Sequence, residues 1–307
     1  MNLEAVQDRR QNDVSFRGAG FILCEPKVGL LARLSLHFLF GIRPAARERM
    51  LFGKSRACLL AQHVMQRLVG GPTQARIQFS EGPTRGSAFK CLTSEKYFLM
   101  GTSYEKPIRE VLQRAVRPGM IVYEIGAHCG YWAVFLSHIC GRQGHVFAFE
   151  PSPINFERLL ENLREGVCFN VTAVNKAVSD ENGCLTLRED GSRSAVLFEG
   201  RGAGNGVEEV AQVESTRLDD FVFLQRHAAP ALLLFDVEGH GGKVLQGARE
   251  VLGSSRPAIL CEVHSPLEET EIKKVVGAFD YLVSPLTGSA KYPRHVFCES
   301  RTPIEPN

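Results

Sequence analysis

The pattern of apolar and polar positions changes near residue 105. Before that point, the stretches 30–40 and 46–69 have the spacing of helices, and the second runs into a Gly-Gly-Pro sequence that stops a helix. Short alternating runs follow, separated by Gly, Pro and Ser, and they predict a small β-meander. These runs lie at 75–79, 88–92 and 97–100. We therefore expect an α+β extension over residues 1–105.

From Ile108 onward, short apolar runs alternate with amphipathic helical segments, which is typical of βαβ units around a parallel sheet. The expected strands are 121–125, 145–149, 171–174, 232–235 and 258–262, with two closing runs at 281–283 and 295–298. The expected helices are 131–139, 153–165, 216–226, 243–252 and 267–277. This pattern predicts an α/β domain over residues 106–307 with a Rossmann-like, seven-stranded, mostly parallel sheet.

Charge and cysteine usage exclude several classes of protein. The chain has 36 Lys and Arg against 34 Asp and Glu in mixed order, so its formal net charge is +2 and no basic patch indicates a nucleic-acid partner. The nine cysteines are scattered without a CxxC pair, which argues against a zinc cluster and against a disulfide framework. Reduced thiols, and a polar first stretch without the apolar run of a secretory signal, lead us to expect a cytoplasmic protein.

The most apolar early segment, 30–40, is too short for a membrane span and contains Arg33 and His37. We expect a helix that packs into the core. Weak contact with a membrane surface is the alternative, because basic residues follow closely. These residues are Arg43, Arg47, Arg49, Lys54 and Arg56.

A glycine-rich turn follows the apolar strand expected at 121–125. The sequence Gly126-Ala127-His128-Cys129-Gly130 leads directly into a helix that begins at Tyr131. A strand, a glycine turn and a helix N-terminus form a place where a ligand can approach backbone N–H groups. Many such turns are only tight turns of α/β folds, so this feature needs support from other residues.

Glu150 ends the next expected strand, where an acidic side chain can accept the hydroxyls of an adenosine ribose. A charge that merely flanks a helix is the alternative reading. Pyrophosphate binding favours further glycines at the positions of His128 and Tyr131, and both are absent. A cofactor with a methionine tail in place of a pyrophosphate tolerates a side chain at position 128, and Glu124 can reach the amino group of that tail. These residues favour S-adenosylmethionine over NAD or FAD.

Six blocks of sequence then follow one another in order. They are VYEIGAHCGY (122–131), VFAFEPSP (146–153), AVSD (177–180), TRLDDF (216–221), FDVEG (235–239) with VLQGA (244–248), and RPAILCE (256–262). In this register the chain resembles the FkbM-type methyltransferases, and GTSYE at 101–105 resembles the approach to their fold. The resemblance implies a class I methyltransferase sheet. It also implies methyl transfer to hydroxyl groups, often on sugars or secondary metabolites.

The resemblance also assigns roles to individual residues. Glu124 and the glycine turn would hold the methionine part of the cofactor, Glu150 the ribose, and residues 177–180 would lie near the adenine. Asp236 would face the methyl-transfer centre, with Glu238 beside it. The complete expected cofactor set is Glu124, Gly126, Ala127, His128, Gly130, Tyr131, Glu150, Pro151, Ala177, Val178 and Asp236.

The chain departs from the family pattern at three positions. Glu124 stands where Asp is usual, which is a mild change. His128 stands where Asn is usual and alters the hydrogen bonds that the turn can make. Gly241 stands where a Glu commonly follows, which removes a carboxylate from the mouth of the active site. We expect these changes to affect the choice of acceptor or the rate.

Methyl transfer to a hydroxyl requires alignment, exclusion of water and removal of a proton. Asp236 has the best expected position for a base, and the other candidates are Glu238, His240 and His264. We expect Asp236, Glu238 and His264 to be catalytic and no metal to take part. The alternative is a divalent metal held by Asp236 with Glu238 or Glu262.

The expected function is O-methylation of a small molecule, sugar or secondary metabolite, with a small-molecule or glycan acceptor as the partner. A protein or peptide methyltransferase and a non-catalytic cofactor-binding protein are the alternatives, and an NAD oxidoreductase is a distant one. Residues 184–214 show only short strand-like runs around the glycine-rich tract 200–206. We interpret this tract as a flexible hairpin, with an insertion that covers the site as the alternative.

Overall fold

The computed structural model describes residues 14–15, 21–25, 42–43, 46, 50, 55, 74–92, 95, 104–190, 193–196, 209–286 and 291–302. The chain divides into two compact units, one of residues 1–109 with 164–167 and one of residues 110–163 with 168–307. The segments 30–40, 97–100 and 200–206, and nearly all of 46–69, lie outside the described residues. Among the described residues, no helix is long and apolar enough to cross a membrane.

A four-stranded antiparallel sheet lies in the first unit, in the order β1-β2-β3-β4. Its strands are β1 (Val14–Ser15), β2 (Phe21–Glu25), β3 (Gln74–Phe79) and β4 (Ala88–Leu92). Along β3, Ala75, Ile77 and Phe79 are buried while their neighbours are not, which is the two-residue period of a half-buried strand. Strands at 75–79 and 88–92 are confirmed. The second neighbour of β3 is β2, which comes from much earlier in the chain.

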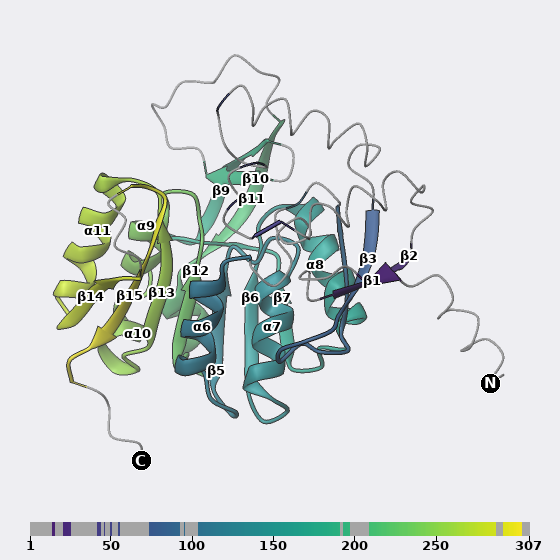
Figure 1. Cartoon of the computed structure of the whole chain (residues 1–307). Coiled ribbons are helices and arrows are strands. Elements are labelled where there is room, and N and C mark those ends of the chain that lie inside the picture. Colours follow the sequence, from purple (N-terminus) through teal and green to yellow (C-terminus); the bar gives the residue numbers. More distant parts are fainter. Residues whose placement is uncertain are drawn as a thin grey trace. The chain divides into compact units, whose positions relative to one another are not determined.

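A seven-stranded sheet forms the second unit, in the order β14-β15-β13-β12-β5-β6-β7 (Figure 1). Its strands are β5 (Ile121–Ile125), β6 (His145–Phe149), β7 (Val171–Val174), β12 (Leu232–Phe235), β13 (Ala258–Val263), β14 (Tyr281–Pro285) and β15 (Arg294–Ser300). The first five in chain order are parallel, and β15 runs antiparallel to both its neighbours. This is the class I methyltransferase sheet, and the expected fold is confirmed.

The helices join these strands. They are α6 (Lys106–Ala115), α7 (Tyr131–Cys140), α8 (Pro153–Glu165), α9 (Gly241–Gln246), α10 (Arg249–Ser254) and α11 (Pro266–Gly277), with one π-helical turn, η3 (Asp220–Leu224). Two expected helices differ. The helix expected at 243–252 breaks at Gly247, because the Gly247 carbonyl oxygen accepts the Asp219 N–H at 2.9 Å and the N–H groups of Glu250 and Val251 donate to Oδ1 of Asp219. The prediction of a helix at 216–226 is wrong for its first residues, because Thr216 lies in a strand and pairs with Val178.

A second small sheet comes from the region where the sequence pattern was weak. Its order is β10-β9-β11-β8. The strands are β8 (Ala177–Val178), β9 (Gly183–Asp190), β10 (Arg193–Val196) and β11 (Glu209–Thr216). Ala177, Leu187 and Val213 form a small buried cluster on it. The segment expected to lie near the adenine therefore starts in a strand.

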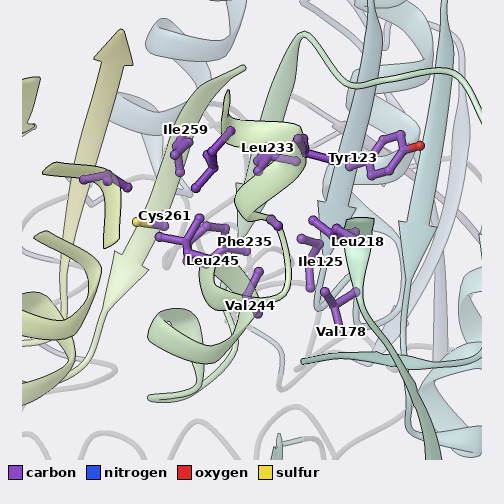
Figure 2. Close-up of a cluster of buried hydrophobic side chains, with 14 of the residues drawn as sticks. Tyr123, Ile125, Val178, Leu218, Leu233, Phe235, Val244, Leu245, Ile259 and Cys261 are labelled. Carbon is purple, nitrogen blue, oxygen red and sulfur yellow. The ribbon is translucent and has the colours of Figure 1, made fainter. Parts of the chain in front are cut away.

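The main hydrophobic core lies on the central strands of the large sheet. Figure 2 shows Leu233 and Phe235 of β12 beside Ile259 of β13, with Val244 and Leu245 of α9 packed against them. All five side chains are fully buried or nearly so. Full burial of such a side chain contributes about 1.5–3 kcal/mol. This packing fixes the carboxyl ends of the strands, where the candidate site residues follow.

Candidate active site

The turn between β5 and α7 holds three residues in the left-handed backbone region. Gly126, His128 and Gly130 have φ angles of 82°, 52° and 87°. Glycine adopts this region freely, and among other residues Asn, Asp and His are the most frequent there. The presence of His128 at a position where Asn is usual therefore has a conformational explanation. Both residues tolerate the backbone that the turn requires.

The N–H groups of this turn are occupied within the protein. Gly126 and Ala127 both donate to the carbonyl oxygen of Phe149 at 2.9 Å. The His128 N–H donates to Oε2 of Glu150 at 2.7 Å. These three N–H groups therefore already have acceptors inside the protein, and the expectation that a ligand approaches the turn stays a prediction. The bonds hold the turn against the end of β6.

Gly126 is required by a close approach to β12. A Cβ atom on Gly126 would lie 2.2 Å from the backbone oxygen of Asp236 and 3.5 Å from Cγ1 of Val237. In addition, the Asp236 N–H donates to the Ile125 carbonyl oxygen at 3.2 Å. The turn expected to hold the cofactor and the residue expected at the methyl-transfer centre are therefore direct neighbours.

Glu124 lies inside β5 with only 3% of its surface exposed. Burial, and then the charge of Glu150, raise the pKa of Glu124 well above its ordinary value. Its Oε2 atom is buried and has no hydrogen-bond partner among the described residues. Buried acceptors are normally paired, so an unpaired carboxyl oxygen here indicates that a donor belongs beside it.

Glu150 follows β6 and is buried. Its Oε2 accepts the His128 N–H, and its Oε1 accepts the Ser152 N–H at 2.9 Å. A carboxylate has about four lone-pair sites, so each oxygen can accept a second hydrogen bond. Glu150 is therefore a fixed double acceptor, which suits a pair of ribose hydroxyls. Pro151 comes directly after it.

His240, one of the expected base candidates, lies apart from the others. It is buried, and its Nε2 lies 3.0 Å from Oγ of Ser179, just after β8. Burial and the charge of Lys243 lower the pKa of His240 to about 4, so its ring is neutral at physiological pH. Lys243 also forms an ion pair with Asp180 at 2.9 Å. These contacts tie the start of α9 to the segment after β8.

The other candidates meet around one imidazole ring at the ends of β12 and β13. Nε2 of His264 lies 3.2 Å from Asp236, 3.5 Å from Glu238 and 3.6 Å from Glu262. Its Nδ1 lies 3.6 Å from Glu268. We call these five residues the His264 cluster. The structure thus brings together all three residues expected to be catalytic, and adds Glu268, which the sequence reasoning missed.

The carboxylates determine the charge of this ring. Burial opposes protonation, but the nearby carboxylates of Asp236 at 3.2 Å and Glu268 at 3.6 Å, with the charge of Glu238, raise the pKa of His264 to about 10. His264 is therefore an imidazolium at neutral pH and cannot accept a further proton. For Asp236, the loss of part of its solvent contact would raise the pKa, but the neighbouring His264 at 3.2 Å and its charge outweigh this effect and lower the pKa of Asp236. The base must be sought among the carboxylates.

The carboxylates of the His264 cluster differ in how far their side chains are exposed to solvent. The side chains of Asp236 and Glu238 are 51% and 41% exposed, against 16% for Glu262 and 2% for Glu268. Asp236 and Glu238 are thus the ones that an acceptor can reach. Ligand atoms of Asp236, Glu262 and His264 also lie within 4.8 Å of one another. The expectation that no metal takes part stays a prediction.

One local sequence pattern, the spacing of Ser265 and Glu268, marks Glu268 as a residue with a structural role. Ser265 and Glu268 have the spacing of a capping box at the start of α11, and the Ser265 side chain accepts the Glu268 N–H. That signal predicts a helix start. It does not predict the neighbours of the Glu268 carboxylate, which come from two other segments.

The strand order of the large sheet and the turn after β5 define a class I methyltransferase. A family model described as the methyltransferase FkbM domain matches residues 124–284, which is more than half of the chain. The chain belongs to this family, and its cofactor is S-adenosylmethionine.

Relatives with described activities match part of the chain. The hexuronic acid methyltransferase AglP of Haloferax volcanii is 25% identical over 177 residues, which cover 56% of this chain and 67% of AglP. The 31-O-demethyl-FK506 methyltransferase FkbM of Streptomyces tacrolimicus is 29% identical over 177 residues, which cover 48% of this chain and 67% of that protein. The crystal structure of the methyltransferase FkbM from Methylobacillus flagellatus KT has 15% identity and a TM-score of 0.44, covering 66% of this chain and 52% of that one.

The residues around the turn fit this cofactor. The unpaired Oε2 of Glu124 matches the positively charged amino group of a methionine tail. The double acceptor Glu150 matches the ribose hydroxyls. The assignment of single residues to the cofactor remains a prediction.

Proposed function

We propose that the protein methylates a hydroxyl group on a small molecule, sugar or secondary metabolite. One observation carries this proposal. Asp236 is half exposed, is ionised, and lies directly against the turn that follows β5. A carboxylate beside the methyl donor is suited to accept the proton that a hydroxyl must lose. The activities of the two relatives, on a hexuronic acid and on a demethylated FK506, support an oxygen acceptor.

The chain's own residues would act as follows. S-adenosylmethionine, when bound, supplies a methyl group on a positively charged sulfur. Glu124 and Glu150 would hold and orient this cofactor. Asp236 would position the acceptor hydroxyl and take its proton at a carboxylate oxygen. His264, as an imidazolium, holds Asp236 in the ionised form and in a fixed direction.

The lowered pKa of Asp236 makes it a weak base, and a weak base is sufficient here. The hydroxyl oxygen becomes strongly acidic as it gains the methyl group. A nearby carboxylate then takes the proton without having to ionise the free hydroxyl first. Glu238, 41% exposed, is the second carboxylate within reach.

We also propose residues 106–307 as the S-adenosylmethionine-binding domain and residues 1–105 as an extension. The cytoplasm is the proposed compartment. The seven cysteines whose side chains the structure describes are free thiols, which supports a reducing environment.

The test has two stages. Calorimetry with S-adenosylmethionine and with NAD should give binding for the first alone, and undetectable S-adenosylmethionine binding at millimolar concentration would refute the proposal. Transfer of a radiolabelled methyl group is then measured on hexuronic acids, polyhydroxylated metabolites and peptides. A label that resists mild alkali is expected, because methyl ethers survive it. An alkali-labile label would indicate a carboxyl ester, and a label only on peptides would favour the protein methyltransferase alternative.

A further inference from the structure

One buried carboxylate connects the two segments that carry the His264 cluster. Glu268 lies in α11 and is 2% exposed. Its Oε1 accepts the N–H of Gly241 at 2.9 Å, and its Oε2 accepts the N–H of His264 at 2.7 Å. Gly241 begins α9 after the loop that holds Asp236, and His264 follows β13 directly. The spacing between the two loops therefore depends on this side chain.

Gly241 makes room for the carboxylate. A Cβ atom at this position would lie 2.9 Å from Oε1 of Glu268, 2.9 Å from Cε2 of Phe235 and 3.2 Å from Cδ1 of Ile272. Phe235 and Ile272 are fully buried in the core and cannot move aside easily. The sequence suggested that Gly241 leaves a carboxylate missing. In the structure, the buried carboxylate of Glu268, which belongs to helix α11, lies beside Gly241.

The local sequence alone would give Glu268 a different role. In a capping box, the glutamate at the third helical position bonds back to the N–H of the capping residue, here Ser265. Instead both oxygens of Glu268 bond outside the helix, to Gly241 and His264. The same Oε2 also faces Nδ1 of His264 at 3.6 Å. Glu268 therefore contacts both the backbone and the ring of the residue that orients Asp236.

We propose that Glu268 is a positioning residue for methyl transfer, which holds the His264 ring against Asp236 by fixing the His264 backbone and facing its Nδ1. This inference rests on the proposed function. The titratable groups that face His264 come from four elements: Asp236 and Glu238 from the loop after β12, Glu262 from β13, Glu268 from α11, and His295 from β15. Glu268 is the only one among these carboxylates that faces Nδ1.

The test is Glu268→Gln in the full chain. Glutamine keeps the shape and one acceptor oxygen, but loses the charge and the second acceptor. We expect the pKa of His264, followed by NMR of histidine-labelled protein, to fall by about one pH unit or more. The dissociation constant for S-adenosylmethionine should stay within about threefold, because the two hydrogen bonds of the Glu268 carboxylate go to Gly241 and His264 and not to the turn. With an active acceptor, kcat should fall by roughly tenfold to a hundredfold while KM for the cofactor is unchanged.

Glu269→Gln is the matched control. Glu269 neighbours Glu268 in α11 and is also buried, but it bonds to Lys273, Tyr292 and Arg294. Its loss should lower stability and leave the His264 pKa unchanged. If both variants leave that pKa unchanged, Glu268 is only structural and the proposal is wrong.

If Glu268→Gln does not fold, Gly241→Ala answers the same question. The added Cβ would displace Oε1 of Glu268 and should also lower the His264 pKa; an unchanged value in folded protein would overturn the proposal. Failure of the proposed function would give a different experimental result. In that case the wild-type chain does not bind S-adenosylmethionine, whereas the His264 titration can still be measured.

Discussion

Nε2 of His264 lies 3.2 Å from Oδ1 of Asp236, and this pair joins the carboxyl ends of β12 and β13. The pair is an imidazolium with a carboxylate, since neighbouring acidic groups hold the proton on the ring. Asp236 also touches the turn after β5, through its backbone oxygen against Gly126. One residue therefore links the expected cofactor turn to a histidine ring that faces a carboxylate on each of its two nitrogens.

Asp236→Asn should lower methyl transfer far more than it lowers cofactor affinity. The amide keeps the shape of the carboxylate but cannot take a proton, and positioned bases contribute about a hundredfold to ten-thousandfold to a rate. Turnover at saturating cofactor and calorimetry with S-adenosylmethionine would measure the two effects. Asp280→Asn is the control, because Asp280 is 58% exposed and pairs only loosely with Arg301 at 3.8 Å. Unchanged turnover in Asp236→Asn would remove Asp236 from the mechanism.

His264 should make the protein less stable at alkaline pH. The pKa of His264 is raised from 6.5 to about 10 in the folded chain. A raised pKa means that the folded state holds the proton more tightly than the unfolded state. The resulting stabilisation is fully present below about pH 6.5 and is lost as pH rises toward 10, and it amounts to a few kcal/mol at most.

Denaturant unfolding of the wild type and of His264→Gln between pH 6 and 10 would measure this effect. The difference in unfolding free energy between the two proteins should shrink as pH rises. Comparing the two cancels the contribution of buried cysteines and tyrosines, which also titrate in this range. A difference that is independent of pH would show that folding does not raise the pKa of His264.

The strands of the large sheet could be predicted because parallel strands are buried on both faces and read as continuous apolar runs. Residues 232–235 and 258–261 are such runs. The prediction was wrong where contacts distant in sequence decide. Thr216 extends a strand because it pairs with Val178, and the helix stops at Gly247 because the backbone groups around it bond to Asp219. Neither contact leaves a periodic signal near these residues.

In the candidate site, too, residues placed by a local sequence pattern could be predicted, and residues placed by contacts distant in sequence could not. Asp236, Glu238 and His264 stand directly after strands that were predicted, so their meeting at one sheet edge follows from the topology. Glu268 stands inside a helix, and its local pattern predicts only a cap. Its role depends on an N–H group that lies 27 positions away in the chain. No local pattern contains such a relation.

Gly126→Ala should lower the unfolding free energy far more than an alanine substitution at another glycine that also has a left-handed backbone. Gly126 has a φ of 82°, and its added Cβ would lie 2.2 Å from the Asp236 oxygen. Gly119 has a φ of 89° with nothing within 4 Å. Gly119→Ala should cost about 1–2 kcal/mol from the left-handed backbone alone. Gly126→Ala should cost more and also weaken S-adenosylmethionine binding, as measured by denaturant unfolding and calorimetry; equal costs would contradict the close approach.

Substitutions at His128 should separate backbone conformation from side-chain chemistry. His128 has a φ of 52°, which asparagine tolerates and a β-branched residue does not. His128→Asn should keep the unfolding free energy within about 0.5 kcal/mol, whereas His128→Val should lose roughly 1–3 kcal/mol. A tenfold change in cofactor affinity in His128→Asn, with stability unchanged, would mean that the imidazole itself contacts the cofactor.

Methyl transfer should survive treatment with EDTA. The imidazolium of His264 already places a positive charge among Asp236, Glu238 and Glu262, so the carboxylates have a cation without a metal. A divalent ion would have to displace that proton and take the ring nitrogen. Turnover of EDTA-treated protein, before and after addition of Mg²⁺, Mn²⁺ or Zn²⁺, tests this directly, with a metal-dependent methyltransferase as the positive control for chelation. Loss of turnover that a single ion restores would make the metal alternative correct and would give Asp236 the role of a ligand in place of a base.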